Sequence, residues 1–173
     1  KGLTRHSEEI SLNDIYDCFP KKYCDVLELL KNNEVEYHLK LSFQNPVIKH
    51  VYDWCIAHEK KVIFTSDMFL DKTIIEKILI ETGYAGYEKL FLSSDVGLKK
   101  STGSLYKYIL KELHISGNKI IHIGDNYRSD YLKAKEAGWN AVLISVHPRR
   151  TSYSSEFGLT KEERSDYRKI KLV

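Results

Sequence analysis

The sequence has no long hydrophobic run and few cysteines, and both shortages restrict what the protein can be. No apolar stretch approaches the roughly 18 residues that a membrane span needs, and no signal-peptide-like apolar segment opens the chain. The three cysteines, Cys18, Cys24 and Cys55, are odd in number and form no CxxC pair. We therefore expect reduced thiols in a cytoplasmic protein, without a cysteine-based zinc site.

The sequence also lacks a concentrated basic region. Its 27 Lys and Arg residues are scattered, and the net charge is only +3. Nucleic-acid-binding proteins usually carry a concentrated basic face, so we expect no nucleic-acid partner. What remains is a chain of 173 residues, 42% hydrophobic and 29% charged, which is the composition of a globular protein with a sizeable core.

The hydrophobic pattern changes near residue 45. Before it, apolar residues such as Val26 and Leu30 recur at helical spacing, and Asn45-Pro46 is typical of a helix start. From residue 61 onward, short apolar runs alternate with helix-like segments. The runs are 62–64, 90–92, 120–123 and 141–144, and the helices between them are expected to end at Gly83, near Gly117 and at Gly138. This alternation predicts an α/β fold with a parallel sheet.

Polar residues follow the first three runs, at the point where each predicted strand ends. Ser66 and Asp67 follow the first run, Lys99-Lys100 the second, and the segment 124–130 (GDNYRSD) the third. Because ligands gather beyond the carboxyl ends of parallel strands, we expect these side chains to form one site. A hydroxyl, an ammonium and two carboxylates suit a phosphoryl group accompanied by Mg²⁺.

The ordered set of Ser66, Lys100 and Asp125/Asp130 resembles the second, third and fourth motifs of the haloacid dehalogenase (HAD) superfamily. The resemblance covers roughly residues 45–146 and is best where an apolar strand leads into GDxxxxD and a helix ending in Ala-Gly. It implies a Rossmannoid three-layer α/β/α fold with a parallel sheet and a small helical cap. We therefore expect a cap segment at 1–44, an α/β core at 45–146 and a polar tail or linker helix at 147–173.

The resemblance also implies roles for residues that bind the substrate. Ser66 should donate a hydrogen bond to a phosphoryl oxygen, and Asp67 and Asn126 should help to bind the substrate. Lys100 should neutralise phosphoryl charge. We prefer Lys100 to Lys99 because the family lysine usually precedes a turn at the start of a helix, as Lys100 does here.

The residues that hold the metal in this family can be assigned in this sequence, whereas its nucleophile cannot. Asp125 and Asp130 should hold Mg²⁺, directly or through water. The attacking group in the family is an aspartate at the end of the first strand, which forms an aspartyl-phosphate that water then hydrolyses. The first residue here is Lys1 and not Met. We expect the nucleophilic aspartate upstream of Lys1, on a central strand outside this chain.

The stretch NDIYDCF (13–19) is similar to the family's first motif, but we interpret it as the start of a helix. A central parallel strand should be a near-continuous apolar run, yet the preceding residues are polar and charged. Ser11 and Asp14 have the spacing of a capping box, and Cys18 stands where the family has threonine. Without the first strand the sheet would be two half-sheets with unpaired edges, unless a segment such as 169–173 fills the gap, in which case catalysis is lost.

Three functions are compatible with these observations. The first is an Mg²⁺-dependent HAD-type phosphohydrolase acting on a small phosphorylated metabolite such as a sugar phosphate. The second is a non-catalytic HAD-like module of a larger protein. The motif sequences are similar to those of a bacterial branch of the family whose members are often associated with glycosyltransferases of surface-polysaccharide pathways. The third is metal-free dehalogenation, which we place last because the two acidic residues of GDNYRSD favour a metal and a phosphate.

Overall fold

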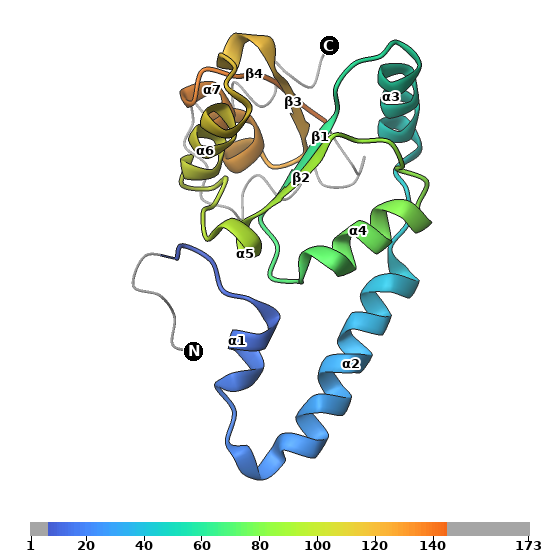
Figure 1. Ribbon diagram of the computed structural model, residues 1–173, viewed down its shortest axis with the longest axis vertical. Coiled ribbons are helices and arrows are strands. Elements are labelled where there is room, and N and C mark those ends of the chain that lie inside the picture. The colour runs from blue at the N-terminus through green and yellow to red at the C-terminus, as the bar shows by residue number, and fades with distance from the viewer. Residues whose placement is uncertain (1–6, 145–173) are drawn as a thin grey trace, which may run out of the picture. The chain divides into compact units, whose positions relative to one another are not determined.

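The computed structural model describes residues 7–144, which form two compact units with a boundary between residues 99 and 100 (Figure 1). In unit 1 the elements are α1 (Leu12–Asp17), the short turn η1 (Lys21–Tyr23), α2 (Cys24–Leu41), α3 (Pro46–Ala57), β1 (Ile63–Ser66), α4 (Lys72–Glu81), β2 (Lys89–Leu92) and α5 (Ser93–Val96). In unit 2 they are α6 (Ser104–Leu113), η2 (Gly117–Lys119), β3 (Ile121–Gly124), the π-helical turn η3 (Tyr127–Leu132), α7 (Lys133–Glu136) and β4 (Asn140–Leu143). The predicted division at residue 45 between cap and core stays a prediction.

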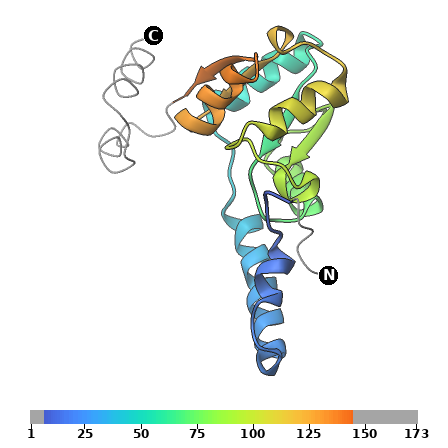
Figure 2. The same cartoon turned by 90° about the vertical axis from the view of Figure 1, so that its left-hand side faces the viewer.

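Helix α1 confirms the interpretation of NDIYDCF as a helix start. The Ser11 hydroxyl accepts a hydrogen bond from the Asp14 N–H (3.2 Å), and the Asp14 carboxylate accepts one from the Ser11 N–H (2.9 Å), which completes a capping box. The Tyr16 hydroxyl donates to Glu34 at 2.8 Å and so ties α1 to α2. The two helices form a hairpin that is closed by η1 (Figure 2).

Helix α3 begins at Asn45-Pro46 as predicted, because the Asn45 side chain accepts hydrogen bonds from two N–H groups of the first turn. Two large apolar residues of this helix, Val47 and Trp54, are exposed. Tyr52 is buried instead. Its ring contacts the rings of Phe64 and Tyr84, and its hydroxyl donates to a backbone carbonyl at 2.7 Å.

Strands β1 and β2 pair in parallel in unit 1, with Ser66 opposite Leu92. β2 is almost fully buried and forms the centre of the core of this unit. Helix α4 connects the strands and ends at Glu81, two residues before Gly83, whose φ of +85° is the left-handed conformation expected after a helix end. The first two predicted strands are thus confirmed within two residues.

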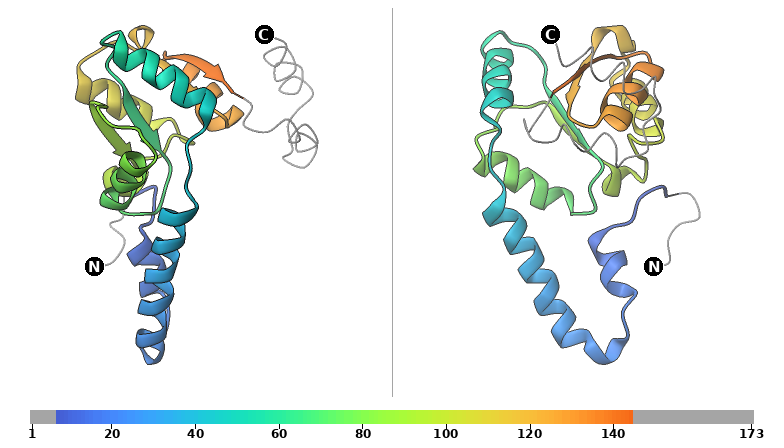
Figure 3. Two further views of the ribbon diagram at one scale, coloured as in Figure 1. Left: turned by 90° about the vertical axis from the view of Figure 1, so that its right-hand side faces the viewer. Right: turned by 180° about the vertical axis from the view of Figure 1, so that it is seen from behind.

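Unit 2 contains the second parallel pair, in which β3 pairs with β4 and the helical segments α6 and α7 pack nearby (Figure 3). Helix α6 buries Tyr106, whose ring lies edge-on to those of His122 and Trp139. The helix ends at Leu113 and not near Gly117. Gly117 is needed for another reason, because a Cβ there would lie 2.5 Å from the carbonyl oxygen of Gly138.

The strands of residues 7–144 form two separate parallel pairs, as expected for a sheet without its first strand. The mixed α/β architecture with parallel strands confirms the predicted Rossmannoid class. Ile121, Ile123 and Val142 leave apolar surface exposed on the second pair. The tail prediction for 147–173, including the segment 169–173, lies outside the described residues. No helix within 7–144 combines the length and the apolar character that crossing a membrane requires.

Candidate active site

The predicted site residues divide between the two units. Ser66 and Asp67 belong to unit 1, where Ser66 is the last residue of β1 and Asp67 follows it. Unit 2 holds the remaining residues, Lys100, Asp125, Asn126 and Asp130, and the last three lie in or directly after the loop that follows β3. The geometry of each group is therefore described within its own unit.

The loop after β3 is built around the side chain of Asp130. A Cβ on Gly124 would meet the Asp130 side chain at 2.5 Å, so only glycine allows that carboxyl group to lie under the end of the strand. The Asn126 N–H donates to Asp130 Oδ2 at 3.0 Å and closes the loop over it. The Gly-Asp pair of the motif therefore has a steric reason for its glycine.

Two side chains converge on the other oxygen of Asp130. Lys100 Nζ lies 2.6 Å from Asp130 Oδ1, and His122 Nε2 lies 3.3 Å from the same atom. The Asp130 residue is only 5% exposed. Burial by itself raises the pKa of the Asp130 carboxyl, but the hydrogen bond from His122 and the charge of Lys100 outweigh it and hold that pKa well below its usual range. Asp130 is thus an ionised, buried carboxylate.

His122, which lies inside β3, also takes part in this arrangement. It is buried among the rings of Tyr106 and Trp139. Its contact with Asp130 was not predicted from the sequence. Because an ionised carboxylate only accepts hydrogen bonds, Nε2 must carry the hydrogen in this contact. The available signal was that His122 lies in the strand that leads directly into GDxxxxD, two residues before its glycine.

Asn126 has a structural task besides the predicted contact with substrate. Its side-chain oxygen accepts hydrogen bonds from the N–H groups of Arg128 and Ser129, both at 3.0 Å, and caps η3. The predicted substrate contact, which stays untested, would therefore involve the side-chain NH₂ of Asn126. Asp125 directly follows Gly124 and so stands at the end of β3.

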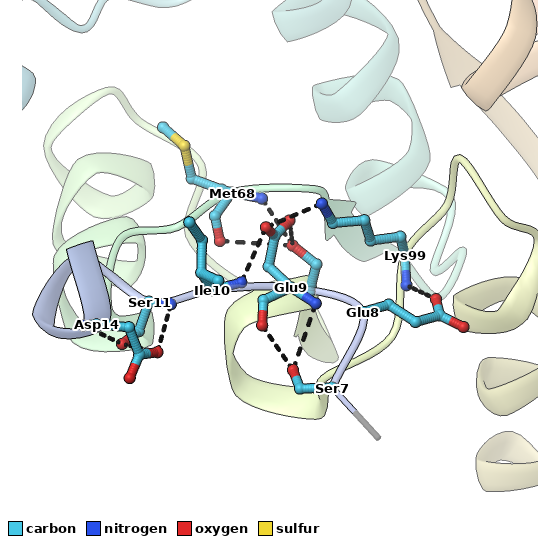
Figure 4. A network of polar contacts seen from close by, with 9 residues as sticks. Ser7, Glu8, Glu9, Ile10, Ser11, Asp14, Met68 and Lys99 are labelled. Carbon is cyan, nitrogen blue, oxygen red and sulfur yellow. Dashed lines mark hydrogen bonds and ion pairs between the residues drawn. The ribbon is translucent and has the colours of Figure 1, made fainter. Parts of the chain in front are cut away.

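In unit 1, a polar network lies beyond the ends of β1 and β2 (Figure 4). Ser93 is fully buried, accepts a hydrogen bond from the Met68 N–H at 2.8 Å and donates to Glu9 Oε2 at 2.9 Å. Lys99 Nζ pairs with Glu9 Oε1 at 3.1 Å. Burial raises the pKa of the Glu9 carboxyl, but hydrogen bonds from the Ile10 N–H, Lys99 and Ser93 lower it below its ordinary value overall.

The same network fixes the segment that leads into α1. The Lys99 N–H donates to a Glu8 carboxylate oxygen at 2.8 Å, and the Glu8 N–H donates to the Gly97 carbonyl, also at 2.8 Å. Leu12 adds a backbone hydrogen bond to Phe69 and is buried. Lys99 is therefore held by the N-terminal segment, whereas Lys100 is held by the loop after β3.

The acidic groups of unit 2 can be compared with the needs of a Mg²⁺ ion. Within residues 7–144, no three side chains of the His, Cys, Asp or Glu type gather as a ready metal centre. Magnesium sites often use one or two carboxylates and complete the shell with water and substrate phosphate, so Asp125 and Asp130 fit this pattern. The Asp130 oxygens already receive three hydrogen bonds, which favours contact through water for that residue.

The fold and this loop together define a class, that of Rossmannoid α/β proteins with an acidic loop after a parallel strand. Comparison with protein families is more specific. A family model described as haloacid dehalogenase-like hydrolase matches residues 15–138. This match spans more than half of the chain, and the chain belongs to the haloacid dehalogenase-like hydrolases. The resemblance inferred from the motifs is thus confirmed.

Solved structures with the same fold include two proteins of low sequence identity. A 2-haloacid dehalogenase from Pseudomonas syringae pv. Tomato DC3000 is 16% identical with a TM-score of 0.52, and the match covers 77% of this chain and 55% of that one. A protein designated beta-phosphoglucomutase from Thermotoga maritima is 13% identical with a TM-score of 0.59, covering 89% and 76%. The chain thus spans about half the length of the dehalogenase. None of the curated proteins compared with the chain matches it.

Proposed function

We propose that the protein is a Mg²⁺-dependent phosphohydrolase that acts on a small phosphorylated metabolite, such as a sugar phosphate. The observation that carries the proposal is the buried ion pair of Lys100 and Asp130 (2.6 Å) at the end of β3. It holds an ammonium group at the acidic loop, where the family handles its substrate. Membership of the haloacid dehalogenase-like hydrolases supports the proposal, and the designation of one structural neighbour as a phosphoglucomutase agrees with phosphate chemistry.

In the proposed reaction, Lys100 stabilises negative charge on the transferring phosphoryl group. Fixed charges are most effective when they need not reorganise during the reaction, and the contact with Asp130 holds Lys100 in place. His122 in turn fixes the Asp130 carboxylate. In unit 1, Ser66 would donate its hydroxyl hydrogen to a phosphoryl oxygen, with Asp67 orienting the substrate.

The metal would be held by Asp125 directly and by Asp130 through water. When bound, Mg²⁺ supplies positive charge that neutralises phosphoryl oxygens and orients them for in-line attack. The Asp130 carboxylate suits this task because its low pKa keeps it ionised. Asn126 holds the loop in shape through its cap and its N–H.

The attacking aspartate belongs, in our proposal, to a strand outside residues 1–173. The observation behind it is that NDIYDCF is a capped helix, so its carboxylates do not stand at the end of a parallel strand. β1 and β3 each pair with only one strand among residues 7–144, and either could accept another. The coding sequence upstream of Lys1 tests this directly, since an apolar run ending in DxxxT is expected there.

The activity is tested with the full-length protein and an aryl phosphate, with and without Mg²⁺. Hydrolysis should require Mg²⁺, and Asp125→Asn should lower kcat by at least about a hundredfold because it removes a charged metal ligand. Asp53→Asn is the matched control, since Asp53 is an exposed partner of Lys49 on α3 and should leave the rate unchanged. Hydrolysis that persists at full rate in Asp125→Asn would disprove the metal assignment.

Absence of any phosphatase activity in a protein that contains the upstream aspartate would favour the non-catalytic alternative. Release of halide from a 2-haloacid without a metal would favour dehalogenation, the activity after which one structural neighbour is named. The association with a glycosyltransferase and the cytoplasmic location remain predictions from the sequence.

A further inference from the structure

Helix α2 carries an apolar stripe that no residue of 7–144 covers. Its side chains are between 50% and 69% exposed and belong to Val26, Leu29, Leu30, Tyr37 and Leu41. At 3.6 residues per turn they fall within an arc of about 120° on a helix about 27 Å long. An apolar surface of this kind on a soluble protein usually marks an interaction site. The opposite side of α2 is half-buried and faces α1 and α4.

The stripe is nearly symmetric about Asn33. Leu30 lies three residues before Asn33 and Tyr37 four residues after it, while Val26 lies seven before and Leu41 eight after. Two such helices packed antiparallel around a two-fold axis half a residue beyond Asn33, the midpoint of both pairs, would therefore place Leu30 opposite Tyr37 and Val26 opposite Leu41. A two-fold interface requires this self-complementarity, because each contact must occur twice.

Residues beyond the helix ends extend the same symmetry. Tyr23 lies ten residues before Asn33 and Phe43 ten residues after it. Both are exposed, and the 87% exposure of Phe43 is high for a large aromatic residue. In the antiparallel arrangement the two rings of different copies would lie opposite each other. Asn33 at the axis would face its own copy, and a polar residue at the centre of an apolar seam specifies the register of helix pairs.

Two charges along one edge of the stripe favour the same arrangement. Lys40 falls just inside the edge formed by Leu29, and Asp25 lies about 40° beyond that edge. They stand seven residues after and eight residues before Asn33. Antiparallel packing puts Asp25 of one copy beside Lys40 of the other. Within its own helix, Lys40 also pairs with Glu36. Parallel packing would instead put each charge beside its own copy, and like charges repel.

We propose that the protein forms a two-fold symmetric homodimer through the α2 stripe, with the two α2 helices antiparallel and Asn33 at the axis. The occupant of the exposed stripe is thus a second copy of this chain. The inference does not depend on the proposed hydrolytic activity, since it uses only residues of α2 and its two ends.

The test uses the full-length protein and measures its mass by sedimentation equilibrium and native mass spectrometry at micromolar concentrations. The wild type should be dimeric. Leu30→Lys and Tyr37→Glu should each weaken the dimer at least about tenfold, because each puts a charge against an apolar side chain. Ile80→Lys is the control, since it makes the same change at an exposed aliphatic residue of α4 and should leave the dimer intact.

The antiparallel register is tested by combining the two substitutions. A mixture of the two single variants should form heterodimers in preference to homodimers, because the new lysine and the new glutamate face each other. The double variant should dimerise at least about tenfold more tightly than either single variant. Far-ultraviolet circular dichroism spectra that match the spectrum of the wild type show that the variants are folded.

A monomeric wild type would overturn the proposal and leave the stripe to another segment or another protein. A dimer that resists Leu30→Lys would place the interface elsewhere and overturn it as well. A double variant no tighter than the single ones would rule out the antiparallel pairing of Leu30 with Tyr37.

Discussion

Two adjacent lysines, one at the end of each unit, have different environments. Lys99 pairs with Glu9 at 3.1 Å, and the side chains are 31% and 11% exposed. Lys100 pairs with Asp130 at 2.6 Å, and the side chains are 12% and 6% exposed. The first pair joins the N-terminal segment to the end of β2, and the second joins the acidic loop after β3 to the chain that precedes α6.

The difference between the pairs separates a structural lysine from a candidate catalytic one. Lys99 holds the entry into α1 through both its ammonium and its N–H. Lys100 holds a carboxylate of the GDxxxxD motif, and the preference for it over Lys99 from the sequence agrees with this geometry. If the comparison is right, changes to the two pairs should affect different properties of the protein.

The largest expected effect is on stability, from removal of the Asp130 carboxylate. Asp130→Ala should lower the free energy of unfolding by about 4 kcal/mol, because Lys100 stays buried and loses this carboxylate. Glu9→Ala should cost only about 1 kcal/mol, since Lys99 can turn toward water. Urea unfolding at neutral pH without Mg²⁺ measures both. Equal losses would mean that burial does not distinguish the pairs.

The next effect concerns catalysis. Lys100→Met should lower kcat at least about a hundredfold, which corresponds to about 2.7 kcal/mol of transition-state stabilisation. Lys99→Met should leave kcat within about threefold of the wild type, because its expected role is structural. Steady-state hydrolysis of an aryl phosphate by folded variants measures the contrast. A greater loss in Lys99→Met would reverse the assignment of the two lysines.

Glycines near the two pairs offer a smaller and matched test. Gly124→Ala should destabilise the protein by about 2 kcal/mol and reduce activity, because the new Cβ would overlap with the Asp130 side chain. Gly97→Ala should cost about 1 kcal/mol through its φ of +75° and leave the activity intact. Thermal melts and assays of both variants separate strain at the site from strain at the N-terminal network.

The sequence predicts the local features of this fold well. The capping box at Ser11, the helix start at Asn45 and the ends of the strands depend on neighbours within a few residues, and all are found. Individual packing contacts between distant segments were not predicted. The burial of Tyr52 depends on Phe64 and Tyr84, which periodicity along α3 cannot identify.

In the candidate site, too, local features were predictable from the sequence and contacts between distant segments were not. The motif residues could be predicted because the spacing of GDxxxxD and its position after a strand are local, and their roles stay predictions. The contacts of Asp130 with His122 and of Glu9 with Lys99 were missed, since both depend on how the chain folds back. No sequence pattern marks Glu9, which lies 90 positions before its partner.

The smallest expected effect is on pH dependence, and it isolates the Glu9 network. The pKa of Glu9 is lowered from 4.5 in the folded protein, so its interactions stabilise fully above about pH 4.5 and are lost as the pH falls through the folded pKa. The stability difference between the wild type and Glu9→Gln should therefore shrink, by up to about 1 kcal/mol, as the solution is acidified. Lys99→Met should reduce this pH-dependent difference because it removes one cause of the low pKa, whereas Lys100→Met should preserve it. Urea unfolding at a series of pH values measures the difference, and a constant difference across the series would show that Glu9 does not contribute through its charge.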